Sequence, residues 1–200
     1  MNLRNATPAM TRKKRILLAV TGASGMPYAK TLALALGENK DIELHMIVSR
    51  AGYKVLNVES GADPRELTAQ AAHMHEPEDI GAPCASGSWI HHGMVVCPCS
   101  MATLAAIANG AGSNLIHRAA DVTLKERRPL ILVARETPLG RIHLENMLKA
   151  SQAGAVIAPA CPAFYLRPET IQDMVDHFTA RILDQLDIPH SLSKRWGEED

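Results

Sequence analysis

The sequence is poor in aromatic residues, has no excess of charge of either sign and contains no long apolar run. Phe, Tyr and Trp together form 4% of the 200 residues, and 21 basic side chains balance 21 acidic ones. A balanced charge produces no overall field that attracts nucleic acid or an anionic membrane, and no apolar stretch approaches a membrane span in length. These absences predict a protein with neither a nucleic-acid nor a membrane partner.

Residues 1–14 lack the apolar stretch of a secretory signal, because they are polar and basic. We therefore expect a flexible leader on a cytoplasmic protein. The remaining chain is long enough for one domain with a substantial core, and no linker divides it.

Cysteine is scarce, with 4 residues in the chain. Cys97 and Cys99 flank a proline, one residue short of a CxxC spacing, and His91 and His92 lie nearby, so a metal site is conceivable. Buried thiols at the end of an apolar strand in a reducing compartment are the simpler explanation. We predict no metal.

Five short apolar runs alternate with helical patterns along the chain. Such an alternation implies right-handed crossovers and a parallel sheet that is covered on both faces. The sequence therefore predicts an α/β fold, a doubly wound parallel sheet in a Rossmann-like or flavodoxin-like three-layer α/β/α arrangement. The domain should span 15–187, with a short helix and a mobile loop within 60–90 and an extended tail at 188–200. The predicted strands are 15–21, 43–49, 93–99, 129–135 and 155–161, and the predicted helices are 26–37, 51–58, 101–109, 114–127, 139–152 and 169–186.

The first predicted strand runs into a glycine turn, TGASG at 21–25. Gly22 and Gly25 permit a tight turn, Ser24 can cap the next helix, and Pro27 suits the first helical turn. The helix start behind such a turn offers backbone N–H groups to a phosphate. The alternative is that the turn only connects a strand to a helix, as many glycine turns do.

The chain lacks the features of a nicotinamide-dependent reductase. Such a protein should have a third glycine in the turn and commonly an acidic residue that closes the second strand. Here the second strand closes with Ser49-Arg50, and no Tyr-x-x-x-Lys pair occurs. A dinucleotide site is therefore disfavoured.

Hydroxyl and cationic side chains recur at the later element ends. Ser100 and Thr103 open the helix after the third strand, either as ordinary caps or as contacts for a ligand rich in oxygen. Arg118 and Lys125 project from nearly the same side of one helix, with Asp121 placed to bridge them. This pattern is typical of a solvated, salt-bridged face, but it would also suit a cationic wall for a phosphate.

The fourth strand ends in Arg135 and Glu136, at the edge where open parallel sheets place ligands. The last helix adds Arg181. Several cations near one glutamate indicate anion binding together with a carboxylate that handles protons.

Six stretches of the chain form a specific combination of motifs. They are TGASG (21–25), ASGS (85–88), MVVCPCSMATLAAIANG (94–110), NLIHRAADVTLKERRPLILVARETPL (114–139), IHLENMLKAS (142–151) and PAFYLRPETI (162–171). In this combination the chain resembles the flavin prenyltransferase family, the UbiX-type proteins once described as aromatic-acid decarboxylases.

The resemblance implies a homo-oligomer, a dodecamer built from trimers, with active sites between subunits. It implies that reduced FMN, as co-substrate, accepts a dimethylallyl group from dimethylallyl monophosphate at its N5 and C6 atoms without a metal. The product, prenylated FMN, would serve a UbiD-type decarboxylase, which acts in ubiquinone biosynthesis in some organisms and on aromatic acids in others.

The resemblance also carries over site residues. Catalytic roles are implied for Glu136 as a proton carrier, for Lys125 as a donor to the leaving phosphate, and for Ser24. The FMN contacts fall on Gly22, Ala23, Ser24, Ser49, Ser100, Met101, Ala102, Thr103 and Arg135. The contacts to dimethylallyl phosphate fall on Ser86, Arg118, Lys125, Glu136, Tyr165, Arg181 and the tail residue Trp196.

Two alternatives remain open beside this reading. A flavin-dependent cysteine decarboxylase of the same fold would give a catalytic role to His91 or His92, but such proteins read PASANT where this chain has PCSMAT. An FMN-binding accessory subunit without turnover would lack the prenyl-phosphate residues, which are present here. Ile80, Trp89 and His91-His92 depart from the family pattern and leave the shape of the prenyl pocket undecided.

Overall fold

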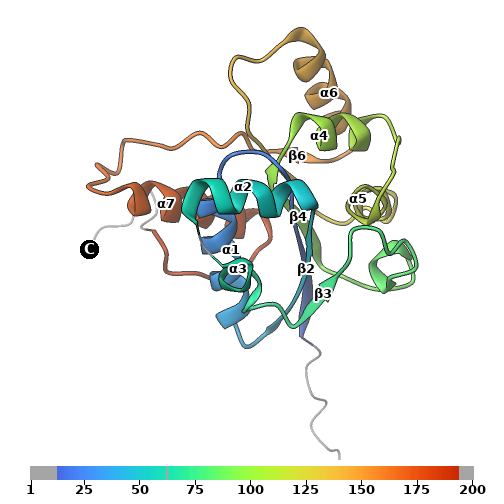
Figure 1. Ribbon diagram of the computed structural model, residues 1–200, viewed down its shortest axis with the longest axis horizontal. Coiled ribbons are helices and arrows are strands. Elements are labelled where there is room, and N and C mark those ends of the chain that lie inside the picture. The colour runs from blue at the N-terminus through green and yellow to red at the C-terminus, as the bar shows by residue number, and fades with distance from the viewer. Residues whose placement is uncertain (1–12, 62, 194–200) are drawn as a thin grey trace, which may run out of the picture.

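The computed structural model describes residues 13–61 and 63–193, in which six parallel strands lie between two layers of helices (Figure 1). The strand order is β3-β2-β1-β4-β5-β6, so the chain begins in the middle of the sheet and winds outward in both directions. This is the strand order of a doubly wound dinucleotide-binding sheet. The strands are β1 (Lys14–Val20), β2 (Ile42–Val48), β3 (His73–His75), β4 (Gly93–Cys99), β5 (Leu130–Ala134) and β6 (Val156–Ile157).

The helices divide between the two faces of the sheet (Figure 1). On one face, α7 (Ile171–Gln185) packs on α1 (Met26–Glu38), beside α2 (Arg50–Ser60) and α3 (Pro64–Thr68). On the other face, α4 (Met101–Ala108) packs between α5 (Leu115–Lys125) and α6 (Arg141–Gln152). A short 3₁₀ helix, η1 (Pro83–Ala85), lies against α5. The predicted three-layer α/β/α fold is confirmed.

The sheet buries both of its faces, which explains why its strands read as continuous apolar runs. In β1, Ile16 and Leu18 belong to the core under α1 and α7, whereas Leu17 and Ala19 belong to the core under α4 and α5. All four side chains are fully buried. The two cores are separated only by the sheet itself.

The apolar runs located five of the six strands. The predicted strand at 155–161 is wrong in length, since β6 covers only Val156–Ile157. Beyond it, the amides of Ala158 and Ala160 still donate to the carbonyls of Leu132 and Ala134 at 2.9 Å. The stretch 60–90 contains the expected short helix, α3, but also β3, which was not predicted. A strand of three residues at the sheet edge, with the sequence HMH, carries too little apolar pattern to be seen.

The expected domain boundaries fall close to the edges of the packed core. β1 begins at Lys14, and Ile188 is 4% exposed and packs in the core under α7. We propose that the folded domain includes one residue more at each end than the sequence suggested. Within the described ranges, no helix combines the length and the apolarity needed to cross a membrane.

Candidate functional site

The ends of β1 and β4 meet where the strand order reverses, which is the place where open α/β sheets bind ligands. Thr21, the residue after β1, fastens the two ends together. Its Oγ1 donates to the carbonyl of Pro98 at 2.8 Å and accepts from the amide of Ser100 at 2.8 Å. Because Thr21 is buried, this crosslink holds the β1–α1 turn and the start of α4 in one fixed arrangement.

The glycine turn is shaped by packing against α2. A Cβ on Gly22 would lie 2.4 Å from the Cβ of Ala51, so only glycine allows this approach. Gly25 has a φ of 124°, a backbone conformation that residues other than glycine rarely adopt. The turn places Ala23 in the core and leaves Ser24 exposed.

The start of α1 is capped by a residue that the sequence analysis missed. Gly25 is the N-cap, so the predicted capping role of Ser24 is wrong. The carboxylate of Glu59 in α2 instead accepts from the amide of Gly25 at 3.0 Å and from the amide of Met26 at 2.8 Å. These are the backbone groups predicted to hold a phosphate. A phosphate in the same place would meet a carboxylate that already occupies it.

The start of α4 offers a second group of backbone amides. Ser100 caps this helix, because its Oγ accepts from the amide of Thr103 at 3.3 Å and donates to the Oγ1 of Thr103 at 3.1 Å. The amides of Met101 and Ala102 lie in the first turn, where a helix has no acceptor of its own. Ser49 caps α2 in the same way, accepting from Gly52 at 3.0 Å. Both serines therefore cap a helix, and the first turn of α4 is left as the better anion site.

Arg135 and Glu136 follow β5 at the same edge of the sheet. The amide of Arg135 donates to the carbonyl of Cys99 at 3.4 Å, which ties the residue to the end of β4. Its side-chain Nε is buried and has no hydrogen-bond partner among the described residues. A buried guanidinium N–H without a partner is costly unless a ligand accepts from it. Glu136 is exposed, and its Oε1 accepts from the amide of Thr137 at 2.9 Å.

The two cations of the predicted wall on α5 are each paired with a carboxylate, and the pairing differs from the prediction. Arg118 donates from Nη1 to Asp121 at 2.7 Å and from Nε to the carbonyl of Ala85 at 3.1 Å. Lys125 pairs with Glu126 instead of Asp121. The predicted bridge through Asp121 is therefore wrong. The reason is that α5 ends at Lys125, and the backbone of Glu126 leaves the helix so that its carboxylate turns back to the ammonium group.

The ASGS segment lies beside this wall. The Oγ atoms of Ser86 and Ser88 are 2.9 Å apart, and a Cβ built on Gly87 would lie 2.8 Å from the Nζ of Lys125. Arg128 holds the segment in place, because its Nη2 donates to the carbonyl of Gly87 at 2.8 Å. Ser86, Arg118 and Lys125 thus gather in one place, as predicted.

Within one chain, however, this wall is far from Glu136. Lys125 precedes β5 and Glu136 follows it, and five strand residues rise about 17 Å. A lysine side chain is too short to span that distance. The two residues cannot hold the same small ligand within one chain.

Arg181 and Tyr165 lie in two further places. Arg181 pairs with Asp184 near the end of α7, and both line a hollow with Ile188. That end of α7 lies at the beginning of the strands, since Lys14 donates to the carbonyl of Asp187 at 3.4 Å. The hydroxyl of Tyr165, in the loop before α7, is 3.0 Å from the Nε2 of His177. Trp196 lies outside the described residues.

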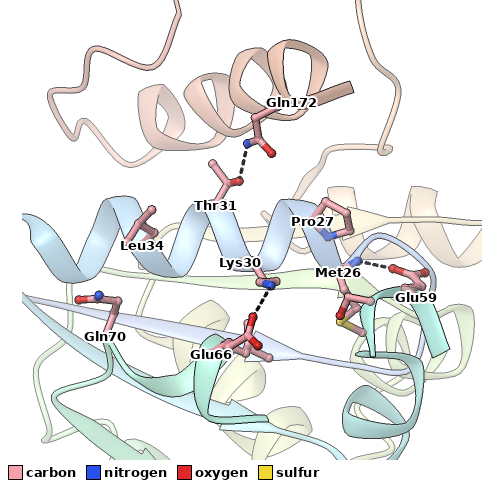
Figure 2. A pocket seen from close by; sticks show the side chains of 11 residues that line it. Met26, Pro27, Lys30, Thr31, Leu34, Glu59, Glu66, Gln70 and Gln172 are labelled. Carbon is pink, nitrogen blue, oxygen red and sulfur yellow. Dashed lines mark hydrogen bonds and ion pairs between the residues drawn. The ribbon is translucent and has the colours of Figure 1, made fainter. Parts of the chain in front are cut away.

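A pocket of about 500 Å³ opens on the outer side of α1, between α2, α3 and α7 (Figure 2). Glu59 and Met26 stand at one end of it, and Lys30 forms an ion pair with Glu66 at 3.0 Å across it. Gln172 of α7 donates to Thr31 at 3.1 Å above it. None of the predicted site residues lines this pocket. Its Met26 and Glu59 end adjoins the β1–α1 turn, since Glu59 accepts from the amide of Gly25.

The cysteines and histidines near β4 do not form the conceivable metal site. Cys97 and Cys99 are buried, and burial raises the pKa of both thiols, that of Cys99 to about 12. The Nε2 of His91 is 2.9 Å from the Oγ1 of Thr123, and burial together with Arg128 lowers the pKa of His91 to about 4. The Nδ1 of His92 accepts from the amide of Arg15 at 3.0 Å. Both histidines therefore have structural partners, and neither lies at the ligand-binding edge.

Trp89 and Ile80 are two of the residues that depart from the family pattern. Trp89 packs against His45 and Arg15 at the start of the sheet, with the guanidinium carbon 5.1 Å from the ring centre. Ile80 is 68% exposed. Trp89 is therefore away from the edge that carries Arg135 and Glu136, whereas Ile80 lies in the loop that follows the C-terminal end of β3.

Comparisons with known proteins fit this arrangement. The profile of a family described as Flavoprotein matches residues 4–191. Flavin prenyltransferase LpdB from Lactiplantibacillus plantarum is 48% identical over 183 residues, which cover 92% of this chain and 98% of that protein.

Two solved structures are similar over almost their whole length. A crystal structure of AnUbiX (PadA1) in complex with FMN and dimethylallyl pyrophosphate superposes with a TM-score of 0.91 at 43% identity, covering 94% of this chain and 100% of that one. A dodecameric FMN-dependent UbiX-like decarboxylase from Escherichia coli O157:H7 has a TM-score of 0.89 at 43% identity, covering 92% and 100%. The FMN-dependent cysteine decarboxylase SpaF, at 15% identity, a TM-score of 0.58 and coverage of 74% and 84%, shares the fold alone.

Proposed function

The chain belongs to the UbiX family of flavin prenyltransferases, and we propose that it joins the dimethylallyl group of dimethylallyl monophosphate to reduced FMN. Prenylated FMN and phosphate are the products. The observation that carries the proposal is the buried, unpartnered Nε of Arg135 at the edge where β1, β4 and β5 end. A cytoplasmic UbiD-type decarboxylase would use the prenylated FMN.

The residues at this edge fit FMN. The exposed first turn of α4, with Met101 and Ala102, suits the flavin phosphate, since the start of α1 is already capped by Glu59. Arg135 then supplies a guanidinium donor to the polar edge of the isoalloxazine. Ser49 and the turn formed by Gly22, Ala23 and Ser24 border the same edge from the β1 and β2 sides.

Reduced FMN would act as the nucleophile. Its N5 would bond to C1 of the allyl group and lose its proton as phosphate departs. The C2=C3 double bond would then take up a proton at C2 while C6 of the flavin bonds to C3 and loses its own proton. The protein must hold the two substrates in contact, stabilise the departing phosphate and move the proton lost from C6. Glu136 is exposed beside Arg135 and is placed to carry that proton. Ser24 faces solvent at the same edge and is available to orient the donor.

The phosphate of the donor requires cations that one chain does not bring to this edge. Ser86, Arg118 and Lys125 form one group, and Arg181 and Tyr165 lie elsewhere. We infer that neighbouring copies in a homo-oligomer, a dodecamer, supply these residues to the Glu136 of the next copy. A symmetric assembly makes such a shared site repeat at every interface.

The leaving group can be stabilised without a metal. Ammonium and guanidinium groups are charge-assisted donors that match a phosphate. The sequence contains no DDxxD cluster of the kind that holds magnesium against a diphosphate. A monophosphate donor therefore suits the residues better than a diphosphate.

The direct test is anaerobic incubation of the protein with reduced FMN and dimethylallyl monophosphate, followed by mass spectrometry of the extracted flavin. We expect the mass of FMN to increase by one dimethylallyl group. Extraction of unmodified FMN alone would refute the proposed reaction and favour a binding subunit without turnover.

Replacing Arg135 with alanine should weaken FMN binding by about 10- to 100-fold, because a buried charged donor loses its acceptor. The affinity can be measured from the change in flavin fluorescence on titration. Arg65→Ala is the matched control, since Arg65 is 90% exposed on α3 and pairs only with Asp63 among the described residues. If both variants bind FMN like the wild type, Arg135 does not contact the flavin.

A further inference from the structure

A cluster of histidines lies at the other end of the sheet, where β2 pairs with β3. Glu43 and His45 are two residues apart in β2 and share one face, and His45 pairs in register with His73 of β3. One ligand atom from each of the three side chains lies within 4.8 Å of the others. Along β2, Glu43 lies about 20 Å and His45 about 13 Å from Ser49, at the edge that binds ligands in the proposed function.

The distances between the ligand atoms suit a small divalent ion. The Oε1 of Glu43 is 2.9 Å from the Nε2 of His45 and 3.6 Å from the Nε2 of His73. In a tetrahedral zinc site with bonds of about 2.0–2.2 Å, neighbouring ligand atoms are about 3.3–3.6 Å apart. One measured distance is shorter than this range and the other is at its upper end, while the ligand nitrogens of His45 and His73 lie within 4.8 Å of each other. The side chains therefore have to shift to bring all three atoms onto one ion.

We propose that Glu43, His45 and His73 bind a divalent transition-metal ion of the zinc class. Two imidazoles and one carboxylate are a ligand set that such ions prefer. His73 has 55% of its side chain exposed, which gives the ion a path from solvent and leaves the fourth position to water.

The surroundings of His45 support this assignment. Its Nδ1 is 3.0 Å from the Nε2 of His75, the kind of outer contact that orients a metal-binding imidazole. With the metal on Nε2, the neutral ring carries its single proton on Nδ1 and donates it to His75. Trp89 packs edge-on against the cluster, with the centre of its ring 4.8 Å from that of the His45 ring.

Two contacts oppose the ion. At 2.9 Å the Nε2 of His45 donates a hydrogen bond to the Oε1 of Glu43, so this proton has to leave Nε2 before a metal can bind there. The Nε of Arg15 donates to the same Oε1 of Glu43 at 3.3 Å, and this bond has to move or lengthen when a metal arrives. The consequence of binding is structural, because the ion would fasten the three-residue edge strand β3 to β2. It takes no part in prenyl transfer, which the proposed function assigns to the opposite end of the sheet.

The test uses the tag-free chain after removal of metals with EDTA. Titration with Zn²⁺ in a calorimeter should give saturable binding of about one ion per chain, and Zn²⁺ should raise the melting temperature. Co²⁺ should give the visible absorption of a four-coordinate site and quench the emission of Trp89, and Trp89→Phe should remove that quenching.

Variants locate the site. Glu43→Gln and His73→Ala should each abolish the saturable binding, and His75→Gln should weaken it about tenfold. His143→Ala, which removes a histidine from α6, should bind Zn²⁺ like the wild type. Circular dichroism identifies any variant that fails to fold. If His73→Ala fails to fold, the isosteric Glu43→Gln still tests the site. The proposal is wrong if the wild type shows no saturable binding, or if His143→Ala loses as much affinity as His73→Ala.

Discussion

Replacing Glu136 with glutamine is expected to slow the formation of prenylated FMN by about 10²- to 10⁴-fold, the usual contribution of a positioned proton carrier. The amide keeps the shape of the side chain but cannot accept the proton that leaves flavin C6. Because Glu136 is exposed and its one described contact is with the neighbouring Thr137 amide, the fold should not change. The rate is measured from the mass of the flavin extracted at successive times.

The same variant should bind FMN with wild-type affinity, because Arg135 and the start of α4 remain intact. Glu38→Gln is the matched control, since Glu38 is an exposed glutamate at the far end of α1. A Glu136→Gln protein that forms prenylated FMN at the wild-type rate would remove this carboxylate from the mechanism.

Replacing Lys125 with alanine should weaken the binding of dimethylallyl monophosphate by about 10- to 100-fold, the effect of losing one charge-assisted contact. FMN affinity should stay within about twofold of the wild type, because Lys125 lies at the other end of β5 from Arg135. The dependence of the initial rate on donor concentration separates the two effects, since the loss appears as a raised KM for the donor.

The variant should fold normally. The ion pair between Lys125 and Glu126 is solvent-accessible, with 46% and 35% of the two side chains exposed, and such pairs add little to stability. Lys40→Ala, which removes an exposed lysine between α1 and β2, should leave the KM unchanged. Equal losses of donor and FMN affinity in Lys125→Ala would contradict the phosphate role.

The apolar runs were sufficient to predict the fold, because strands buried on both faces need no alternation and end in polar residues. Arg135 and Glu136 could be placed at the ligand edge for the same reason. The cap on α1 could not be found, because Glu59 is 34 residues beyond Gly25 in sequence and reaches it only through the packing of α2. No local pattern distinguishes this glutamate from any other exposed one.

The pairing on α5 was wrong because helical spacing considered only carboxylates within the helix and not Glu126, the residue directly after it. Asp121 and Lys125 have the correct spacing, but the chain leaves the helix at Glu126 and a nearer carboxylate becomes available. The histidine cluster was missed because it depends on the register of β2 with a strand of three residues. Register is a property of the folded sheet, and the sequence alone does not specify it for so short an edge.

The central claim is that Lys125 of one copy and Glu136 of another complete the same site. Mixing the Lys125→Ala and Glu136→Gln proteins, by dissociation and reassembly or by co-expression, tests it directly. In a random equal mixture about a quarter of the shared sites contain both native side chains. At a donor concentration well below the wild-type KM, where both variants are slow, about a quarter of the wild-type activity should therefore return. A mixture no more active than the two variants measured separately would show that the residues do not meet between copies.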